Sequence, residues 1–163
     1  MSDTSYVVLG LLERAEPATP YGLKRLAELT TNNFWALAHT QLYSECARLA
    51  REGVLSERVE EGGRRRRFYR LTARGRRMLA AWREEPAAEL YELRDRATLK
   101  LFFGADPARL AATQLAEHED RLAGYERLLA SLPDLPRGQR LALEAGIGHE
   151  REYIRFWSRL LEG

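Results

Sequence analysis

Four consecutive arginines stand at positions 64 to 67, after the pair Gly62-Gly63 and directly before the aromatic pair Phe68-Tyr69. Runs of like charge repel one another, so either an external partner or a fully solvated surface must account for them. The chemistry they suit is neutralisation of phosphates, along a nucleic-acid backbone or in a narrow minor groove. The candidate phosphate contacts are Arg64, Arg65, Arg66 and Arg67. A solubilising hairpin whose charges contact only water is the alternative.

A second polar group lies upstream, where Leu42, Cys46 and Leu49 recur at helical spacing and predict the buried face of a helix. Glutamine pairs with adenine, arginine pairs with guanine, and hydroxyl groups bind bases or phosphates. The predicted contacts from this region are Thr40, Gln41, Tyr43, Ser44 and Arg48, and Lys24 is added from the preceding helix. An ordinary polar surface is the alternative, and the nearby arginine run favours nucleic-acid contact.

The elements that would position these residues follow from hydrophobic spacing and capping residues. A first helix is predicted near the start of the chain, with Thr4 or Ser5 as its N-cap. Thr19 followed by Pro20 predicts the start of a second helix, because proline is favoured at the first helical position. The third helix is predicted from about residue 39 to residue 52.

The spacing then changes from a helical to an alternating pattern. Residues 54–60 and 66–71 are rich in strand formers and flank a glycine pair, which predicts a β-hairpin. Thr72 is the predicted N-cap of a further helix that continues through Trp82. Three helices, a hairpin and a helix form the element order of a winged helix-turn-helix, in which the third helix enters the major groove and the hairpin is the wing.

The rest of the chain is predicted to be helical, so the fold class is mainly α, with domains over residues 1–84 and 85–163. Two long helices carry apolar residues at spacings of three and four, which suits packing against a second copy of the chain. The predicted dimerisation residues are Leu115, Leu122, Tyr125, Leu129, Ile154, Trp157 and Leu161.

Composition bounds the partners of the chain. Residues 1–80 contain 14 Lys and Arg against 9 Asp and Glu, whereas residues 81–163 contain 12 against 15. A basic front half suggests a polyanion-binding domain. A single cysteine, Cys46, cannot form an internal disulfide, and neither a signal peptide nor a membrane-spanning stretch is evident. A cytoplasmic location without membrane association is therefore expected.

The motifs of enzymes are missing from the sequence. His149 opens a segment that begins like a zinc-protease motif but lacks the second histidine, so no metal site is predicted. Gly146-Ile147-Gly148 follows no predicted strand, which excludes a dinucleotide fingerprint. Neither a catalytic constellation nor a cofactor is expected.

Several segments together resemble the PadR family of transcriptional regulators. The wing and its following helix, "RRRRFYRLTARGRRML", are similar to those of the family, as are "VVLGLLERAEPATPYGLKRL", "LKLFFG" and "HEREYIRFWSRLLE". The stretch "NNFWALAHTQLYSECARLAREGVL" resembles the phenolic-acid-responsive branch. The resemblance implies a homodimeric, ligand-responsive repressor that leaves its operator when an aromatic or lipophilic effector binds between its domains. Two symmetry-related third helices would select a palindromic operator in double-stranded DNA.

By the same resemblance, Tyr21, Trp35 and His39 are candidate effector-binding residues, since aromatic rings and an imidazole suit a carboxylated ring. Packing between domains is the alternative role for these side chains. A different class of function also stays open, namely a protein-interaction adaptor whose helices and basic hairpin bind an acidic protein. Discrimination between duplex sequences would favour the regulator, and indifference to DNA would favour the adaptor.

Overall fold

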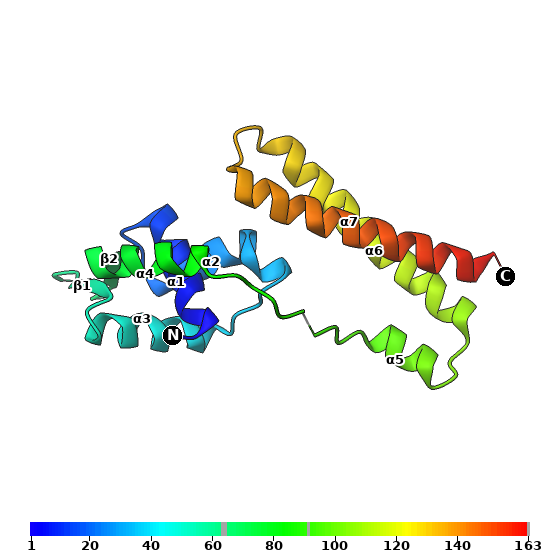
Figure 1. Ribbon diagram of the computed structural model, residues 1–163, viewed down its shortest axis with the longest axis horizontal. Helices are drawn as coiled ribbons and strands as arrows, with labels where there is room; N and C mark the ends of the chain where they lie inside the picture. The colour runs from blue at the N-terminus through cyan, green and yellow to red at the C-terminus, as the bar shows by residue number, and fades with distance from the viewer. Residues whose placement is uncertain (63–64, 91, 163) are drawn as a thin grey trace. The chain divides into compact units, whose positions relative to one another are not determined.

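The computed structural model describes residues 1–62, 65–90 and 92–162, without the side chains of Asn33 and His39. The chain forms two compact units, Met1–Glu89 and Leu90–Gly163 (Figure 1). Each unit has its own buried cluster of apolar side chains.

The N-terminal unit contains the predicted sequence of elements, and the predicted winged-helix fold is confirmed. Its elements are α1 (Asp3–Ala15), α2 (Pro20–Leu29), the 3-10 helix η1 (Thr31–Asn33), α3 (His39–Arg51), β1 (Leu55–Val59), β2 (Arg67–Leu71) and α4 (Ala73–Glu84).

Antiparallel pairing joins β1 to β2, with Leu55 opposite Leu71 and Val59 opposite Arg67. A further backbone bridge ties Ala18 to Tyr69, through N–H···O bonds of 3.2 and 2.9 Å. The wing, defined here as residues 55–71, is therefore attached at its base to the segment between α1 and α2.

The inward faces of α1, α2, α3 and the hairpin bury one continuous core. Leu42, Cys46 and Leu49 of α3 are buried as their spacing predicts, which turns Gln41 and Ser44 toward solvent. Burial raises the pKa of the Cys46 thiol to about 12. At neutral pH this cysteine is accordingly a small apolar core residue.

Two N-caps fix the starts of α2 and α4 as predicted. Thr19 Oγ1 accepts the N–H of Gly22 at 3.1 Å, and Thr72 Oγ1 accepts the N–H of Gly75 at 3.2 Å. The cap of α1 differs from the prediction, because this helix begins at Asp3, after Ser2. Ser5 is fully buried inside the helix and donates its hydroxyl hydrogen bond to Glu45 of α3.

The C-terminal unit consists of α5 (Arg96–Phe102), α6 (Pro107–Ser131) and α7 (Arg137–Leu161). The two long helices pack against each other, as Figure 1 shows. Asp95 caps α5 and Asp106 caps α6 by accepting the N–H groups of Ala97 and Ala108. In the part of the chain that is described, none of the helices has the length and apolarity needed to cross a membrane.

Candidate nucleic-acid interface

The wing alternates basic and aromatic side chains along its strands. Arg58 of β1 lies opposite Phe68 of β2, and its guanidinium lies 5.5 Å from the centre of the phenyl ring. Arg66 approaches the same ring at 5.8 Å. Both distances are within the range of cation–π attraction, so Phe68 holds two guanidinium groups on the wing.

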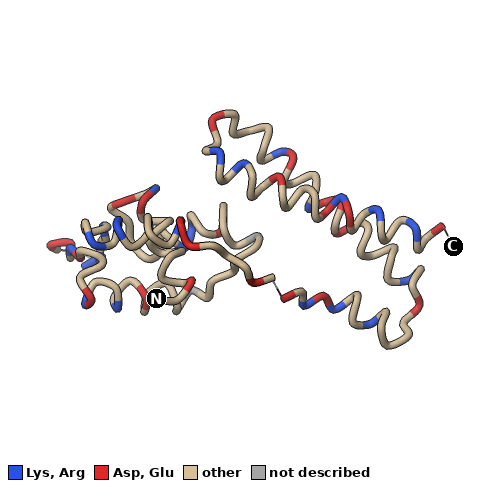
Figure 2. The backbone as a smooth tube through the Cα atoms, in the orientation of Figure 1, with Lys and Arg blue, Asp and Glu red and all other residues tan. Residues whose placement is uncertain are grey.

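Two glutamates of the wing pair with its arginines. Glu60 forms two hydrogen bonds with Arg66, at 2.8 Å from Nε and 2.9 Å from Nη2. Glu57 accepts a bond of 2.5 Å from Arg67 Nη1. The hydrogen bond from Arg66 lowers the pKa of Glu60, so its carboxylate is charged at neutral pH. Figure 2 shows that both signs of charge occur along this hairpin.

Two further arginines of the wing were not among the predicted contacts. Arg58 and Arg70 are exposed, and both belong to the strand face that carries Phe68. Alternation along paired strands could have indicated them, since residues two apart share a face. Of the predicted run, Arg65, Arg66 and Arg67 are exposed, whereas Arg64 lies outside the described residues.

Helix α3 presents a polar face that is partly engaged by its own backbone. Gln41 Oε1 accepts the N–H of Ala38 at 3.1 Å and thereby caps the helix. The Ser44 hydroxyl donates to the carbonyls of Thr40 and Gln41, at 3.0 and 3.1 Å. Because an amide oxygen has two lone pairs, this bond leaves Gln41 its N–H donors and one further acceptor position.

Arg48 has a different environment from the other predicted contacts. Its guanidinium donates to Glu45 at 3.0 and 2.6 Å, to Glu52 at 2.6 Å and to the Ser5 hydroxyl at 3.0 Å. Hydrogen bonding by Arg48 is the main cause that lowers the pKa of Glu45. Arg48 therefore links α3 to α1, and the sequence could not show this because Ser5 is 43 residues away.

The remaining predicted contacts lie on exposed or half-buried surface. Thr40 and Tyr43 are exposed on α3, and Lys24 of α2 forms an ion pair of 3.4 Å with Glu28.

Among the candidate effector residues, Tyr21 and Trp35 have exposed fractions of 57% and 42% in the N-terminal unit. The side chain of His39 lies outside the described residues.

The predicted dimerisation residues occupy several environments in the C-terminal unit. Trp157 is fully buried with Ala97 and Ala111, and Leu115 packs against this cluster. Leu122, Tyr125, Leu129 and Ile154 are half-buried, and Leu161 is exposed. Much of the apolar stripe of α6 and α7 is thus used within the unit, because the two helices cover each other.

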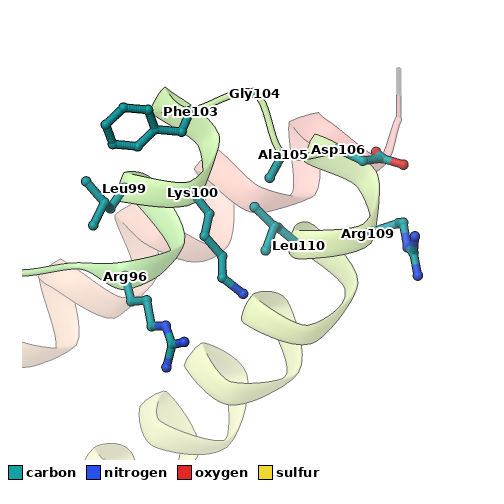
Figure 3. A pocket seen from close by; sticks show the side chains of 9 residues that line it. All are labelled: Arg96, Leu99, Lys100, Phe103, Gly104, Ala105, Asp106, Arg109 and Leu110. Atoms are coloured by element: carbon teal, nitrogen blue, oxygen red, sulfur yellow. The ribbon is translucent and has the colours of Figure 1, made fainter.

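Three apolar side chains at the end of α5 are more exposed than the stripe residues of α6 and α7, and none of the three was a predicted dimer contact. Phe102 and Phe103 are exposed by 81% and 77%, and Leu99 by 56%. Leu99 and Phe103 line an open pocket of about 590 Å³ that extends to Leu110 of α6 (Figure 3). The charged residues that also line this pocket are three basic ones, Arg96, Lys100 and Arg109, and the acidic Asp106.

No group of three or more potential metal ligands occurs among the described residues. An exposed polar helix face, a basic hairpin and a compact three-helix core instead define a winged-helix protein of the DNA-binding class.

Comparison with known proteins gives the family. Residues 8–81 match the Transcriptional regulator PadR-like family, and residues 93–162 match the model described as Virulence activator alpha C-term. Negative transcriptional regulator PadR of Bacillus subtilis is 28% identical over 96% of this chain and 94% of its own. Residues 8–81 are therefore a domain of the PadR-like transcriptional regulators, a family of DNA-binding regulators and not of enzymes.

Two solved structures show the same fold. Bacillus subtilis PadR in complex with operator DNA has a TM-score of 0.86 at 23% identity, covering 99% of this chain and 98% of that chain. The complex of Bacillus subtilis PadR with p-coumaric acid has a TM-score of 0.78 at 22% identity, covering 96% and 92% respectively.

Proposed function

We propose that this regulator is a homodimeric repressor that binds a palindromic operator and is released by a small aromatic acid. The single observation that supports this most is the exposed polar face of α3 next to an arginine-rich wing. In a winged helix these two surfaces meet the major groove and the adjacent backbone of one duplex. The similar fold solved with operator DNA supports the same use of the surfaces.

The contacts divide by chemistry into two classes. Wing arginines Arg58, Arg65 and Arg70 bind phosphates or the minor groove, where their positive charge is favourable for any sequence. Gln41 donates from its amide to a base edge, while Tyr43 reaches the backbone. Arg48 acts by positioning α3 against α1 through Ser5 and Glu45.

A homodimer formed through the C-terminal helical unit would have two-fold symmetry. Two copies related by a two-fold axis would present two α3 helices to sites one duplex turn, roughly 34 Å, apart. Phe102 and Phe103, at the end of α5, supply apolar surface for the partner copy, because large solvent-exposed aromatic side chains commonly mark an interface.

The effector is proposed from two exposed aromatic residues, Tyr21 at the start of α2 and Trp35, which follows η1. Beside Trp35, Thr31 Oγ1 and Asn32 Oδ1 are buried without a hydrogen-bond partner in the described structure. A carboxylated phenol would bring both a ring and polar groups to such a site. To act as an inducer it must bind the state unable to hold DNA more tightly than the DNA-bound state.

A mobility-shift assay on the DNA upstream of the chain's own gene tests this function. We expect a retarded complex that resists random competitor DNA and dissociates when p-coumaric acid or a related aromatic acid is added. Binding without any sequence preference would contradict the operator, and binding unaffected by a panel of aromatic acids would contradict the effector. An acidic protein bound in preference to every duplex would favour the adaptor function instead.

Two variants separate the two classes of contact. Gln41→Ala should change preference at one base position, at a cost of about 1–3 kcal/mol for the preferred base. Arg58→Ala with Arg70→Ala should weaken all duplexes by a similar factor and reduce the dependence of log K on log salt by roughly 0.9 per lost contact. Arg25→Ala removes one positive charge from the exposed surface of α2 and is the control for the loss of each single charge.

A further inference from the structure

The arginine run of the wing is partly neutralised by carboxylates of the same hairpin. Residues 55–71 contain six arginines and three glutamates, so half of the formal positive charge is offset locally. The hairpin turn brings Glu57 and Glu60, which precede the glycines, back to arginines that follow them.

The geometry of the Glu60 pair determines which donors remain. Both carboxylate oxygens bind the edge of Arg66 formed by Nε and Nη2, at 2.8 and 2.9 Å. This edge is one of the two that a guanidinium uses to bind a phosphate through two parallel hydrogen bonds. A phosphate must therefore displace Glu60 or use the other edge beside a negative charge.

The ion pair with Glu57 likewise occupies a hydrogen-bond donor of Arg67. Glu57 accepts from Arg67 Nη1 at 2.5 Å, and the register places it diagonally across from Arg67 on one face of the hairpin. The side chains of Arg66 and Arg67 are nevertheless about 60% and 61% exposed. The glutamate side chains are less exposed, at 33% for Glu60 and 24% for Glu57, so each ion pair lies at the surface, where such pairs contribute about 0–1 kcal/mol to folding.

We propose that Glu57 and Glu60 compete with DNA phosphates for Arg67 and Arg66, and so limit the affinity of the wing for DNA of any sequence. This inference rests on the proposed function, because it concerns the strength of the same DNA contact. Phosphate attraction supplies nearly all non-specific binding, so an internal competitor shortens the time the regulator spends on non-operator DNA.

The test compares the full-length protein with the variant Glu57→Gln/Glu60→Gln, which keeps the size of both side chains. Binding to a fluorescent duplex of random sequence is measured by anisotropy over a range of salt concentrations. We expect affinity to rise about three- to fivefold for each arginine released. The slope of log K against log salt should steepen by up to roughly 0.9 per arginine.

Glu61→Gln is the matched control, because it removes one carboxylate from the wing and Glu61 has no ion pair within the described residues. We expect Glu60→Gln to raise affinity more than Glu61→Gln does. Equal gains from these two variants would mean that net charge alone acts, and would overturn the proposed competition. Weaker binding by the double variant would also overturn it, since the glutamates would then orient the arginines for DNA.

The same titration separates this inference from the proposed function. If the parent binds duplexes and the double variant binds identically, only the competition is wrong. If neither protein binds any duplex while both keep their helical circular dichroism and melting temperature, the proposed function is wrong and the inference falls with it.

Discussion

The two units of the chain differ in how completely they bury their own apolar residues. Within the described structure, fifteen buried apolar side chains form one cluster in the N-terminal unit, but only three form the cluster of the C-terminal unit. The C-terminal unit exposes Leu99, Phe102 and Phe103 within five residues of one another, and the N-terminal unit also exposes Leu29 and Phe34. The N-terminal unit thus has the larger core of its own, whereas the helical unit combines a small core with a clustered apolar surface that favours association.

The largest expected effect comes from removing the two exposed rings at the end of α5. Phe102→Ser with Phe103→Ser should weaken self-association at least about 100-fold, because aromatic side chains at an interface carry much of its binding energy. Sedimentation velocity at micromolar concentration should then show monomers. Operator affinity should fall as well, because a monomer presents a single α3 helix to the duplex.

Leu132→Ser, between α6 and α7, is the control, since Leu132 is 41% exposed and lies outside the α5 surface. This variant should sediment like the parent protein. A dimer that survives the double substitution in α5 would show that association uses another surface, and the stripe residues Leu122, Tyr125 and Ile154 would be tested next.

A smaller effect is expected inside the N-terminal unit, at the junction of α4 and β1. A Cβ atom at Gly75 would lie 2.4 Å from the backbone carbonyl oxygen of Val54 and 3.3 Å from the side chain of Leu71. Backbone cannot move as freely as a flexible side chain, so Gly75→Ala should lower the free energy of unfolding by about 1–3 kcal/mol. Urea denaturation followed by circular dichroism measures the change.

Gly10→Ala should raise the free energy of unfolding, whereas Gly75→Ala should lower it. Gly10 lies within α1, and a Cβ there would meet no atom within 4 Å in the described structure. Alanine favours a helix over glycine by about 0.5–1 kcal/mol, so this variant should be more stable than the parent. Equal losses from both substitutions would contradict the steric explanation for Gly75.

The sequence predicted structural features with local signals better than features that depend on tertiary contacts. Elements marked by local signals were predicted well: the Thr19 and Thr72 caps, and the alternating hairpin. Their signals lie within a few residues of one another. The α1 cap was predicted at Thr4 or Ser5, and this was wrong because the tertiary contact of Ser5 with Glu45 buries that hydroxyl inside the helix.

Site residues were harder to predict, because their availability depends on partners distant in sequence. Arg48 has the outward spacing of a base contact, yet Ser5 and two glutamates engage its guanidinium. Spacing alone also could not show that α6 and α7 cover each other. Apolar stripes predict that a helix packs, but they do not identify the surface it packs against.

A comparably small effect is expected at the link between α1 and α3. Hydrogen bonding by Arg48 holds the pKa of Glu45 below its ordinary value, with a further contribution from Ser5. A carboxylate with a lowered folded-state pKa contributes stability above its unfolded pKa and loses it as pH falls through the folded value. Glu45→Gln should therefore cost about 1 kcal/mol at pH 7, and this cost should shrink progressively below about pH 4.

Glu52→Gln is the control for Glu45→Gln, because it removes a carboxylate that binds Arg48 without contacting α1 through Ser5. Glu52 binds the same guanidinium, but only as an exposed neighbour four residues along α3. Its loss should cost less than about 0.5 kcal/mol and leave the acid part of the stability profile close to that of the parent. Equal costs for both variants across the pH range would mean that the Ser5 contact adds nothing, and Arg48 would then be a residue of α3 alone.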